Sequence, residues 1–318
     1  MKLGRILCAS ALALLAPLAA AQNQLSIATG GTGGVYYPLG GGIAELINKH
    51  MPGYKAVAEV TGASVENMGL IARGDSDVAF SLADTAYQAY HGTGRFDGRK
   101  LPVRAIAAVY PNAVQIVTLG NSNIKSLKDL KGKRVSVGAP GSGTEVNAKA
   151  LLEANGIKYE DMTVQRLNFN ETADALRDGQ IDAGFWSVGP PTSSILNLAA
   201  TREIRLLSLT AEEIANARKV EPVFAPYTLR AGMYDKVGDV ATIGIPNVLV
   251  VSAEMPDDVA HAITKLIFDR TADLIAIHPA ANDTTVDFSL GSSPIPLHPG
   301  AIRYYEGAGH KVPANLKP

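Results

Sequence analysis

Short apolar runs alternate with helical patterns along most of this chain, and this alternation is the strongest constraint on its fold. The apolar runs predict strands at Leu25–Thr29, Ala56–Val60, Val78–Ser81, Val103–Val109, Ala113–Leu119, Arg134–Gly138, Thr163–Leu167, Ile181–Trp186, Ile204–Leu209 and Val248–Ser252. The helical patterns cover residues 39–50, 64–73, 84–91, 144–155, 171–178, 192–200, 211–218 and 257–277. Strands that alternate with helices predict an α/β fold with mostly parallel sheets.

The first 21 residues have the pattern of a cleavable export signal. Lys2 and Arg5 form a positive start, Ile6–Leu18 form an apolar run, and Ala19–Ala21 provide small residues for cleavage. Because a spanning helix needs roughly 18 apolar residues, the shorter run favours cleavage over the alternative, an uncleaved anchor. We therefore predict a soluble product in the periplasm.

Cysteine content and charge exclude several classes of site. Cys8 is the only cysteine and lies inside the signal, so the mature chain has no disulfide, cysteine-bound zinc or catalytic thiol. The 29 basic residues less Lys2 and Arg5 leave 27 against 30 acidic residues, a net charge near −3. This balance gives no basic field that would attract nucleic acid or anionic lipid.

Catalytic and metal-binding patterns do not emerge from the sequence. The six histidines are scattered without metal-ligand spacing, and no serine occupies a Gly-x-Ser-x-Gly elbow. We therefore expect a protein that is not an enzyme and that uses no metal and no cofactor. An exported α/β enzyme is the less favoured alternative.

The chain length and a weak internal sequence repeat predict two lobes. Removing 21 residues from 318 leaves 297, more than one hydrophobic core usually organises. The segment Leu25–Gly34 is similar in pattern to Arg134–Thr144, and Gly74–Ser81 is similar to Gly179–Ser187. Each half thus offers a strand, a Gly/Ser/Thr turn and a helix in the same order, which would place these turns on opposite walls of a cleft. Chance similarity between common motifs is the alternative.

Two extended segments beside proline and asparagine are the candidate hinges, at residues 111–119 and 245–252. They divide the chain into a signal peptide at 1–21, lobe I at 22–112 plus 252–318, and lobe II at 113–251. The tail after residue 278 is rich in Pro and Gly. We expect it to pack on lobe I as irregular structure.

The loop Gly30–Gly34 is the strongest single feature for binding. Its glycines let backbone amides approach a ligand, and a helix that begins near Pro38 would point its unpaired N–H groups at an anion. The loop lacks the Gly-Lys-Ser/Thr ending of a nucleotide site, so a small anion is preferred. A purely structural strand-to-helix turn is the alternative.

A second loop, Gly138–Thr144, repeats this logic with the hydroxyls of Ser142 and Thr144. Thr144 is also a plausible N-cap, and Ser64 in a third corner is as consistent with capping as with ligand contact. Neither glycine loop contains lysine or arginine. The ligand is therefore expected to be a small organic anion held by amides, hydroxyls and helix starts.

These motifs together resemble a known family of binding proteins. The matching segments are Ile27–Pro38, Gly62–Asn67, Gly132–Thr144 and Asp178–Phe185. They are similar to the solute-binding subunits of tripartite ATP-independent periplasmic (TRAP) transporters, in the TAXI subfamily. The resemblance implies a type II periplasmic-binding-protein fold, with two α/β lobes joined by two hinge strands. It also implies a small carboxylate ligand such as glutamate, glutamine or 2-oxoglutarate, which is delivered to a membrane permease.

Carried over to this sequence, the resemblance implies a set of pocket residues on both lobes. They are Gly33, Gly34, Tyr36, Tyr37, Ser64, Ser81, Ser142, Gly143, Thr144, Trp186 and Ser187. Where some relatives have a longer aromatic patch, this chain has Phe185–Pro191, which leaves the ligand's identity open. We expect a monomeric transport receptor. An exported binding protein of the same fold that signals to a sensor or acts at the surface is the main alternative.

Overall fold

A computed structural model describes residues 22–318. The predicted signal at 1–21, with Cys8, lies outside the described residues. The strands are β1 (Asn23–Ala28), β2 (Tyr54–Glu59), β3 (Val78–Leu82), β4 (Val103–Leu119), β5 (Arg134–Ser136), β6 (Thr163–Gln165), β7 (Ala183–Val188), β8 (Ile204–Leu206), β9 (Ala225–Leu229) and β10 (Val240–Ser252). The helices are α1 (Tyr36–His50), α2 (Ser64–Arg73), α3 (Ala83–His91), α4 (Gly143–Ala154), α5 (Phe169–Arg177), α6 (Ser193–Ala199), α7 (Ala211–Val220), α8 (Asp257–Asp269), α9 (Thr271–Ile277), α10 (Val286–Ser292) and α11 (Pro299–Gly307).

The strands form one continuous sheet in the order β2-β1-β3-β10-β4-β7-β5-β6, with β8 beside β4 and β9 beside β10. The pairs at either end, β1 with β2 and β3, and β5 with β6 and β7, are parallel. The predicted α/β class is therefore confirmed. The prediction of mostly parallel sheets is wrong at the centre, where β10 and β4 are antiparallel to each other and to β3, β7, β8 and β9.

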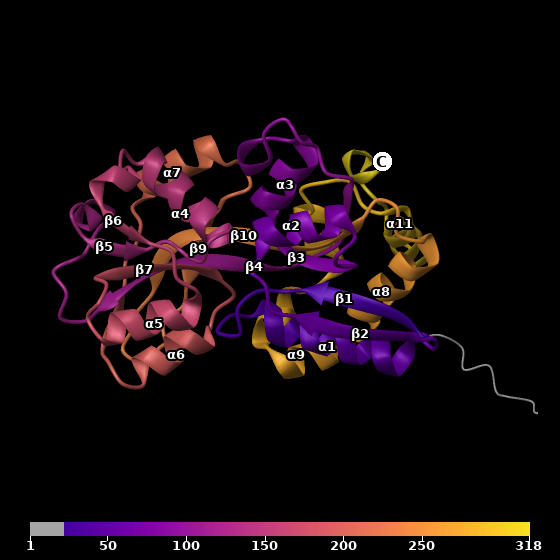
Figure 1. Cartoon of the computed structure of the whole chain (residues 1–318), viewed down its shortest axis with the longest axis horizontal. Coiled ribbons are helices and arrows are strands. Elements are labelled where there is room, and N and C mark those ends of the chain that lie inside the picture. The colour runs from indigo at the N-terminus through magenta and orange to yellow at the C-terminus, as the bar shows by residue number, and fades with distance from the viewer. Residues whose placement is uncertain (1–21) are drawn as a thin grey trace, which may run out of the picture.

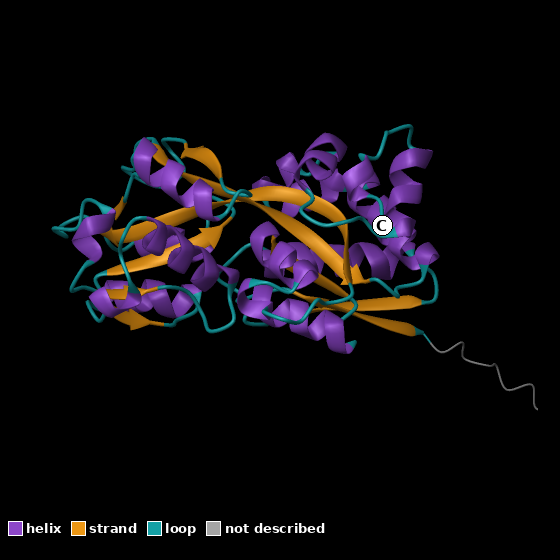
Figure 2. Cartoon of the chain, turned by 90° about the horizontal axis from the view of Figure 1, so that it is seen from above, coloured by secondary structure: helices purple, strands orange, loops and turns teal. Residues whose placement is uncertain are grey.

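Figure 1 shows two bodies, one built around β1–β3 (lobe I) and one around β5–β7 (lobe II). The long strands β4 and β10 run from one body into the other, and the view from above in Figure 2 shows the same crossing. The sequence predicts a break in β4 at Pro111, yet the strand is continuous. Pro111 lies opposite Pro246 of β10 in the register. Proline has no backbone N–H donor. Because the two prolines are paired with each other, the missing hydrogen bonds fall at one position, and the strands stay paired on either side of it.

The buried apolar residues form two clusters. One fills lobe I around Ile27, Phe80 and Val250 and reaches lobe II at Trp186. The other lies mainly in lobe II, where it includes Phe185, and it reaches lobe I at Leu82 and Ala83. Neighbouring residues of β7 thus belong to different clusters, because successive side chains of a strand point to opposite faces of the sheet. Helices cover both faces of each part of the sheet, as an α/β fold requires.

Two predictions for the C-terminal part are wrong. The helical pattern at 257–277 forms two helices, α8 and α9, because the backbone leaves the helical conformation at Arg270 (φ −118°, ψ 24°). The tail after residue 278 is not irregular, since it contains α10 and α11. His298 caps α11 with Pro299 in the first turn, and the buried Tyr305 hydroxyl donates to the Ile106 carbonyl of β4 (2.9 Å). The tail therefore packs on lobe I as ordered helices.

Asn67 holds the start of α2 against the strands of lobe I. It is fully buried, and its amide nitrogen donates to the carbonyls of Thr29 (2.7 Å) and Phe80 (2.8 Å). Its amide oxygen accepts from the Thr61 hydroxyl (2.7 Å). One side chain thus joins the ends of β1 and β3 to the loop before α2.

We expect Asn67→Leu to lower the free energy of unfolding by about 1–3 kcal/mol, because a buried carbonyl would lose its donor while the side-chain volume is nearly kept. Urea denaturation of both proteins measures the change. Asn282→Leu is the control, because the Asn282 amide bonds only to the Pro279 carbonyl at an exposed position. Equal stability of the Asn67 variant and the native protein would contradict this role.

Candidate ligand-binding site

A cavity of about 60 Å³ lies between the two lobes. In the same measure one water needs about 10–15 Å³, so the cavity has the size for a small molecule. Its wall is built from both lobes: Gly30, Gly31, Gly34, Val35, Tyr36, Thr61, Gly62, Ala63, Ser64, Leu82, Asn112, Ala139, Ser142, Gly143, Thr144, Asn168, Phe169, Ser187 and Val188. Loops before helices supply most of these residues.

Four helices begin at this wall. The first residues of α1, α2, α4 and α5 are Tyr36, Ser64, Gly143 and Phe169, and all four line the cavity. The first N–H groups of a helix have no partner within it and carry partial positive charge. Two helix starts from each lobe therefore bring positive potential and their remaining free N–H groups to one cavity, an arrangement that suits an anion.

Glycine is required where the lobe II loop approaches lobe I. Gly138 has a positive φ of 101°, which favours glycine. A Cβ on Gly143 would lie 2.6 Å from both the Ser64 hydroxyl oxygen and a methyl carbon of Leu82. Only a residue without a side chain lets the start of α4 come this close to lobe I.

Three hydroxyl groups of lobe II keep a proton for a ligand. The Ser142 hydroxyl oxygen accepts from the Glu145 amide (3.1 Å), and that of Thr144 accepts from the Ser187 amide (3.3 Å). The Ser187 side chain is 5% exposed, and its hydroxyl has no hydrogen-bond partner among residues 22–318. The predicted capping role of Thr144 is wrong, because Ser142 is the N-cap of α4. Accepting one bond leaves each hydroxyl free to donate another.

Lobe I contributes a serine and a neutral phenol. The Ser64 hydroxyl oxygen accepts from the Leu82 amide (3.1 Å). The Tyr36 hydroxyl donates to the side-chain oxygen of Asn247 in β10, and its ring stacks on Phe80 with centroids 4.8 Å apart. Burial raises the pKa of Tyr36 well above its usual range, so it stays neutral. Apart from Tyr36, no ionisable side chain from the described part of the chain lines the cavity.

The cavity brings together seven of the eleven predicted site residues, and their contact with a ligand stays a prediction. Those that line it are Gly34, Tyr36, Ser64, Ser142, Gly143, Thr144 and Ser187. Those that do not are Gly33, Tyr37, Ser81 and Trp186.

Strand alternation explains two of the four exceptions. Ser81 and Leu82 are neighbours at the end of β3, and only Leu82 faces the cavity, while the Ser81 hydroxyl donates to the Leu82 carbonyl (3.0 Å). Likewise Ser187 faces the cavity from β7, whereas the Trp186 indole points to the other face and donates to Ser194 (3.1 Å). Successive side chains within a strand point to opposite faces of the sheet, although the last residue of β7, Val188, also reaches the wall.

The other two exceptions lie at the edge of the first loop. Tyr37 is 37% exposed and follows Tyr36 in the first turn of α1, where adjacent side chains point in different directions. Gly33 faces α6, because its carbonyl accepts from the Ser193 hydroxyl (3.1 Å). Gly33 therefore contributes to contact between the lobes.

Sequence analysis missed several lining residues, among them Asn112, Asn168 and Phe169. A signal for the last two was present, because Asn168 and Glu171 form a capping box that marks the start of α5. Asn112 follows Pro111 in β4, and its amide nitrogen donates to the Ser187 carbonyl (2.9 Å). Nothing in the local pattern distinguishes Asn112 from other polar strand residues.

The lobes touch on both sides of the cavity. The Gly141 carbonyl of lobe II accepts from the amides of Val65 (3.0 Å) and Glu66 (3.2 Å) of lobe I. Asp84 of α3 accepts from the Asn147 amide of α4. With the Gly33 contact to α6, these bonds define a closed arrangement of the lobes.

The described part of the chain gives two further results for function. No three His, Cys, Asp or Glu side chains within residues 22–318 are grouped to hold a metal ion. In the same range, no helix combines the length and apolar character needed to cross a membrane.

Known proteins share this architecture. A protein from Bordetella bronchiseptica RB50 is 16% identical with a TM-score of 0.57, over 91% of this chain and 99% of the other. The ligand-binding component of an ABC-type import system from Staphylococcus aureus, solved with zinc bound, is 15% identical with a TM-score of 0.50, over 83% and 87%. The predicted two-lobed periplasmic-binding-protein fold with two connecting strands is confirmed. A model of the NMT1-like family matches residues 27–309, and this chain therefore belongs to that family.

Proposed function

We propose that this protein is a solute-binding receptor of the periplasm that encloses a small carboxylate between its lobes and delivers it to a TRAP-type membrane permease. The observation that carries the binding role is the convergence of four helix starts and the unpaired Ser187 hydroxyl on one cavity between the lobes. Delivery to a TRAP permease rests on the sequence motifs. The name of the Staphylococcus aureus protein favours an ABC-type importer as the second candidate partner.

The two connecting strands supply the hinge in this proposal. We place lobe I at 22–112 plus 252–318 and lobe II at 113–251, with bending near residues 111–119 and 245–252. Pro111 and Pro246 face each other in the β4–β10 ladder, where neither can donate a backbone hydrogen bond. A register shift follows between Asn247 and Val248. Both strands thus have fewer backbone hydrogen bonds at the same position, and this weak pairing permits the lobes to rotate apart.

The proton on Asp84 is a further consequence of closure. Asp84 is fully buried against α4 of lobe II, and one of its carboxylate oxygens has no hydrogen-bond partner within residues 22–318. Burial, with the negative charge of Glu221 as the next cause, raises the pKa of Asp84 to about 7. Opening the lobes would expose this carboxyl and return its pKa toward the usual value of about 3.9. Closure at neutral pH is thus linked to proton uptake.

A ligand screen tests the receptor role. Carboxylates such as glutamate, glutamine and 2-oxoglutarate, with sugars and cationic amino acids beside them, are added in a thermal-shift assay, since a ligand that binds only the native state raises its apparent stability. We expect stabilisation by at least one carboxylate, and compaction by that ligand in small-angle scattering. If only sugars or cations stabilise the protein, the carboxylate role is wrong.

Ser187→Ala is expected to weaken carboxylate binding about 10- to 150-fold, because a hydrogen bond to a charged group contributes roughly 1.5–3 kcal/mol. Stability should not fall, since the hydroxyl has no partner among residues 22–318. Calorimetry measures the affinity. Ser81→Ala is the matched control, a buried serine outside the cavity whose loss should leave affinity unchanged. Equal affinities of the two variants would contradict a ligand contact at Ser187.

The affinity should also depend on pH through Asp84. Its pKa is higher in the closed state, so closure is favoured at low pH and loses this support as pH rises through about 7. By proton linkage we expect affinity to fall about tenfold between roughly pH 6 and pH 8. Asp84→Asn should flatten the profile, because the amide does not titrate. Parallel profiles for the two proteins would show that Asp84 is not the group responsible.

A further inference from the structure

The wall of the cavity offers no ionic partner to a ligand. The described residues that line it include no aspartate, glutamate, lysine, arginine or histidine. The donors are the amides of the helix starts and neutral hydroxyls, above all the unpaired hydroxyl of the buried Ser187. Any charge on a ligand is therefore balanced by helix ends and neutral dipoles alone.

Three of the four helix starts already carry a carboxylate. The first turns of α2, α4 and α5 contain Glu66, Glu145 and Glu171, whereas the first turn of α1 contains no acidic residue. The Glu66 carboxylate accepts from the Gly62 amide (2.7 Å). Gly62 lines the cavity, so this solvent-exposed negative charge is one hydrogen bond away from the wall.

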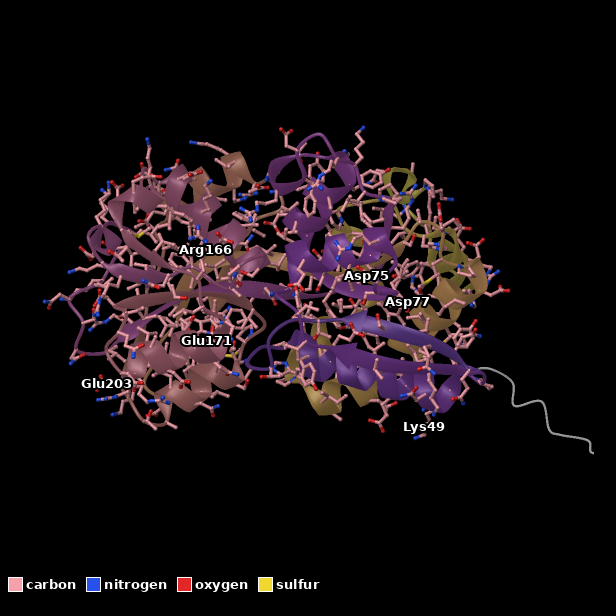
Figure 3. The ribbon with its side chains drawn as sticks, viewed as in Figure 1. Lys49, Asp75, Asp77, Arg166, Glu171 and Glu203 are labelled. Carbon is pink, nitrogen blue, oxygen red and sulfur yellow. The ribbon has the colours of Figure 1, made fainter. Side chains whose placement is uncertain are left out.

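The other two carboxylates are bound in a similar way on lobe II. Glu171 accepts from the Asn168 amide (2.9 Å), and Asn168 also lines the cavity. Glu145 forms an ion pair with Arg166 (2.7 Å), which uses the positive charge of that side chain. Figure 3 labels Arg166 and Glu171 in lobe II. Each of these carboxylates offsets part of the positive potential of its own helix start.

From this arrangement we infer that the site selects a carboxylate with one negative charge and no ammonium group, the class of short 2-oxo and unsubstituted monocarboxylic acids. The inference rests on the proposed function, because it concerns the ligand of the same cavity. It departs from the ligands named by the sequence resemblance, because glutamate and glutamine carry an ammonium group and 2-oxoglutarate carries a second carboxylate.

An ammonium group is disfavoured by the helix starts. Their N–H groups repel a positive charge, and the carboxylates of Glu66 and Glu171 already accept from backbone amides. A buried ammonium without an anionic partner is costly. An amino acid would therefore bind more weakly than the 2-oxo acid of the same skeleton.

A second carboxylate is disfavoured by the same acidic residues. One anion can use the start of α1 and the free hydroxyls, but a second would face the charges of Glu66 and Glu171 with no lysine or arginine in the wall. Leu82, Val188 and Phe169 instead provide apolar surface for a short carbon chain. The cavity thus suits a molecule that is anionic at one end and apolar at the other.

Four acids with one five-carbon skeleton test both points at once. They are 2-oxovalerate, norvaline with an ammonium group, 2-oxoglutarate with a second carboxylate, and glutamate with both. Calorimetry with the full mature chain should give at least tenfold tighter binding of 2-oxovalerate than of the other three. 2-Oxohexanoate controls for length, and it should bind much more tightly than 2-oxoglutarate.

The outcomes separate this inference from the receptor role. If norvaline, 2-oxoglutarate or glutamate binds as tightly as 2-oxovalerate, the inferred selectivity is overturned. The proposed role as a carboxylate receptor is then still supported. If none of these acids binds but another carboxylate does in the wider screen, the inference again fails alone. If no carboxylate binds in either experiment, both proposals fail.

A charge variant tests the cause. Glu66→Gln removes the negative charge behind Gly62 while its side-chain oxygen can still accept from that amide, so the preference for 2-oxovalerate over 2-oxoglutarate should shrink at least threefold. Glu203→Gln is the matched control, because Glu203 lies toward the outer end of lobe II in Figure 3 and does not line the cavity. The Glu203→Gln variant should prefer 2-oxovalerate over 2-oxoglutarate as strongly as the native protein does. An unchanged preference in the Glu66 variant would overturn the electrostatic explanation.

Discussion

Unpaired backbone N–H groups at the starts of α1, α2, α4 and α5 are the constraint on which the site depends. A buried N–H group without a partner is unfavourable, and closing the lobes removes these helix starts from bulk water. Side chains satisfy part of the demand, since Ser142 caps α4 and Asn168 caps α5. At α2 the Gly141 carbonyl of lobe II accepts from two amides, and at α1 no side-chain cap is formed. An anion between the lobes would supply acceptors that the protein itself provides only in part, which couples binding to closure.

The packing of the lobes shows why small residues are concentrated in the cavity wall. Close approach of α4 to lobe I is possible only because Gly143 has no side chain to meet Ser64 and Leu82. At the opposite edge, the Gly33 carbonyl meets the Ser193 hydroxyl. The glycine loops therefore serve two purposes at once. They expose amides to a ligand, and they let the lobes close to hydrogen-bonding distance around it.

Much of the fold was predictable because its signals are local. The helix at 64–73 has its expected bounds, since Gly74 ends it in a left-handed conformation that glycine favours. The missed strand β9 is mostly exposed, and in the missed first half of β10 the apolar residues are interrupted by Thr242, Gly244 and Pro246. In the site, motif matching selected Ser81 and Trp186 along with their neighbours, although strand alternation lets only Leu82 and Ser187 reach the cavity. Asn112 depends on long-range strand pairing and leaves no local signal.

Asn247 links the wall of the cavity to the proposed hinge. It lies in β10 next to Pro246, and its amide nitrogen donates to the Asn112 side chain (2.7 Å) and to the Tyr110 carbonyl (2.9 Å) of β4. Its amide oxygen accepts from the Tyr36 hydroxyl at the start of α1. Tyr36 and Asn112 both line the cavity. These side-chain bonds join the two strands beside the paired prolines, which leave the backbone ladder without donors. The proposed bending point is thus held by residues that border the cavity. A shift of either lining residue on binding would therefore alter the restraint on both strands together.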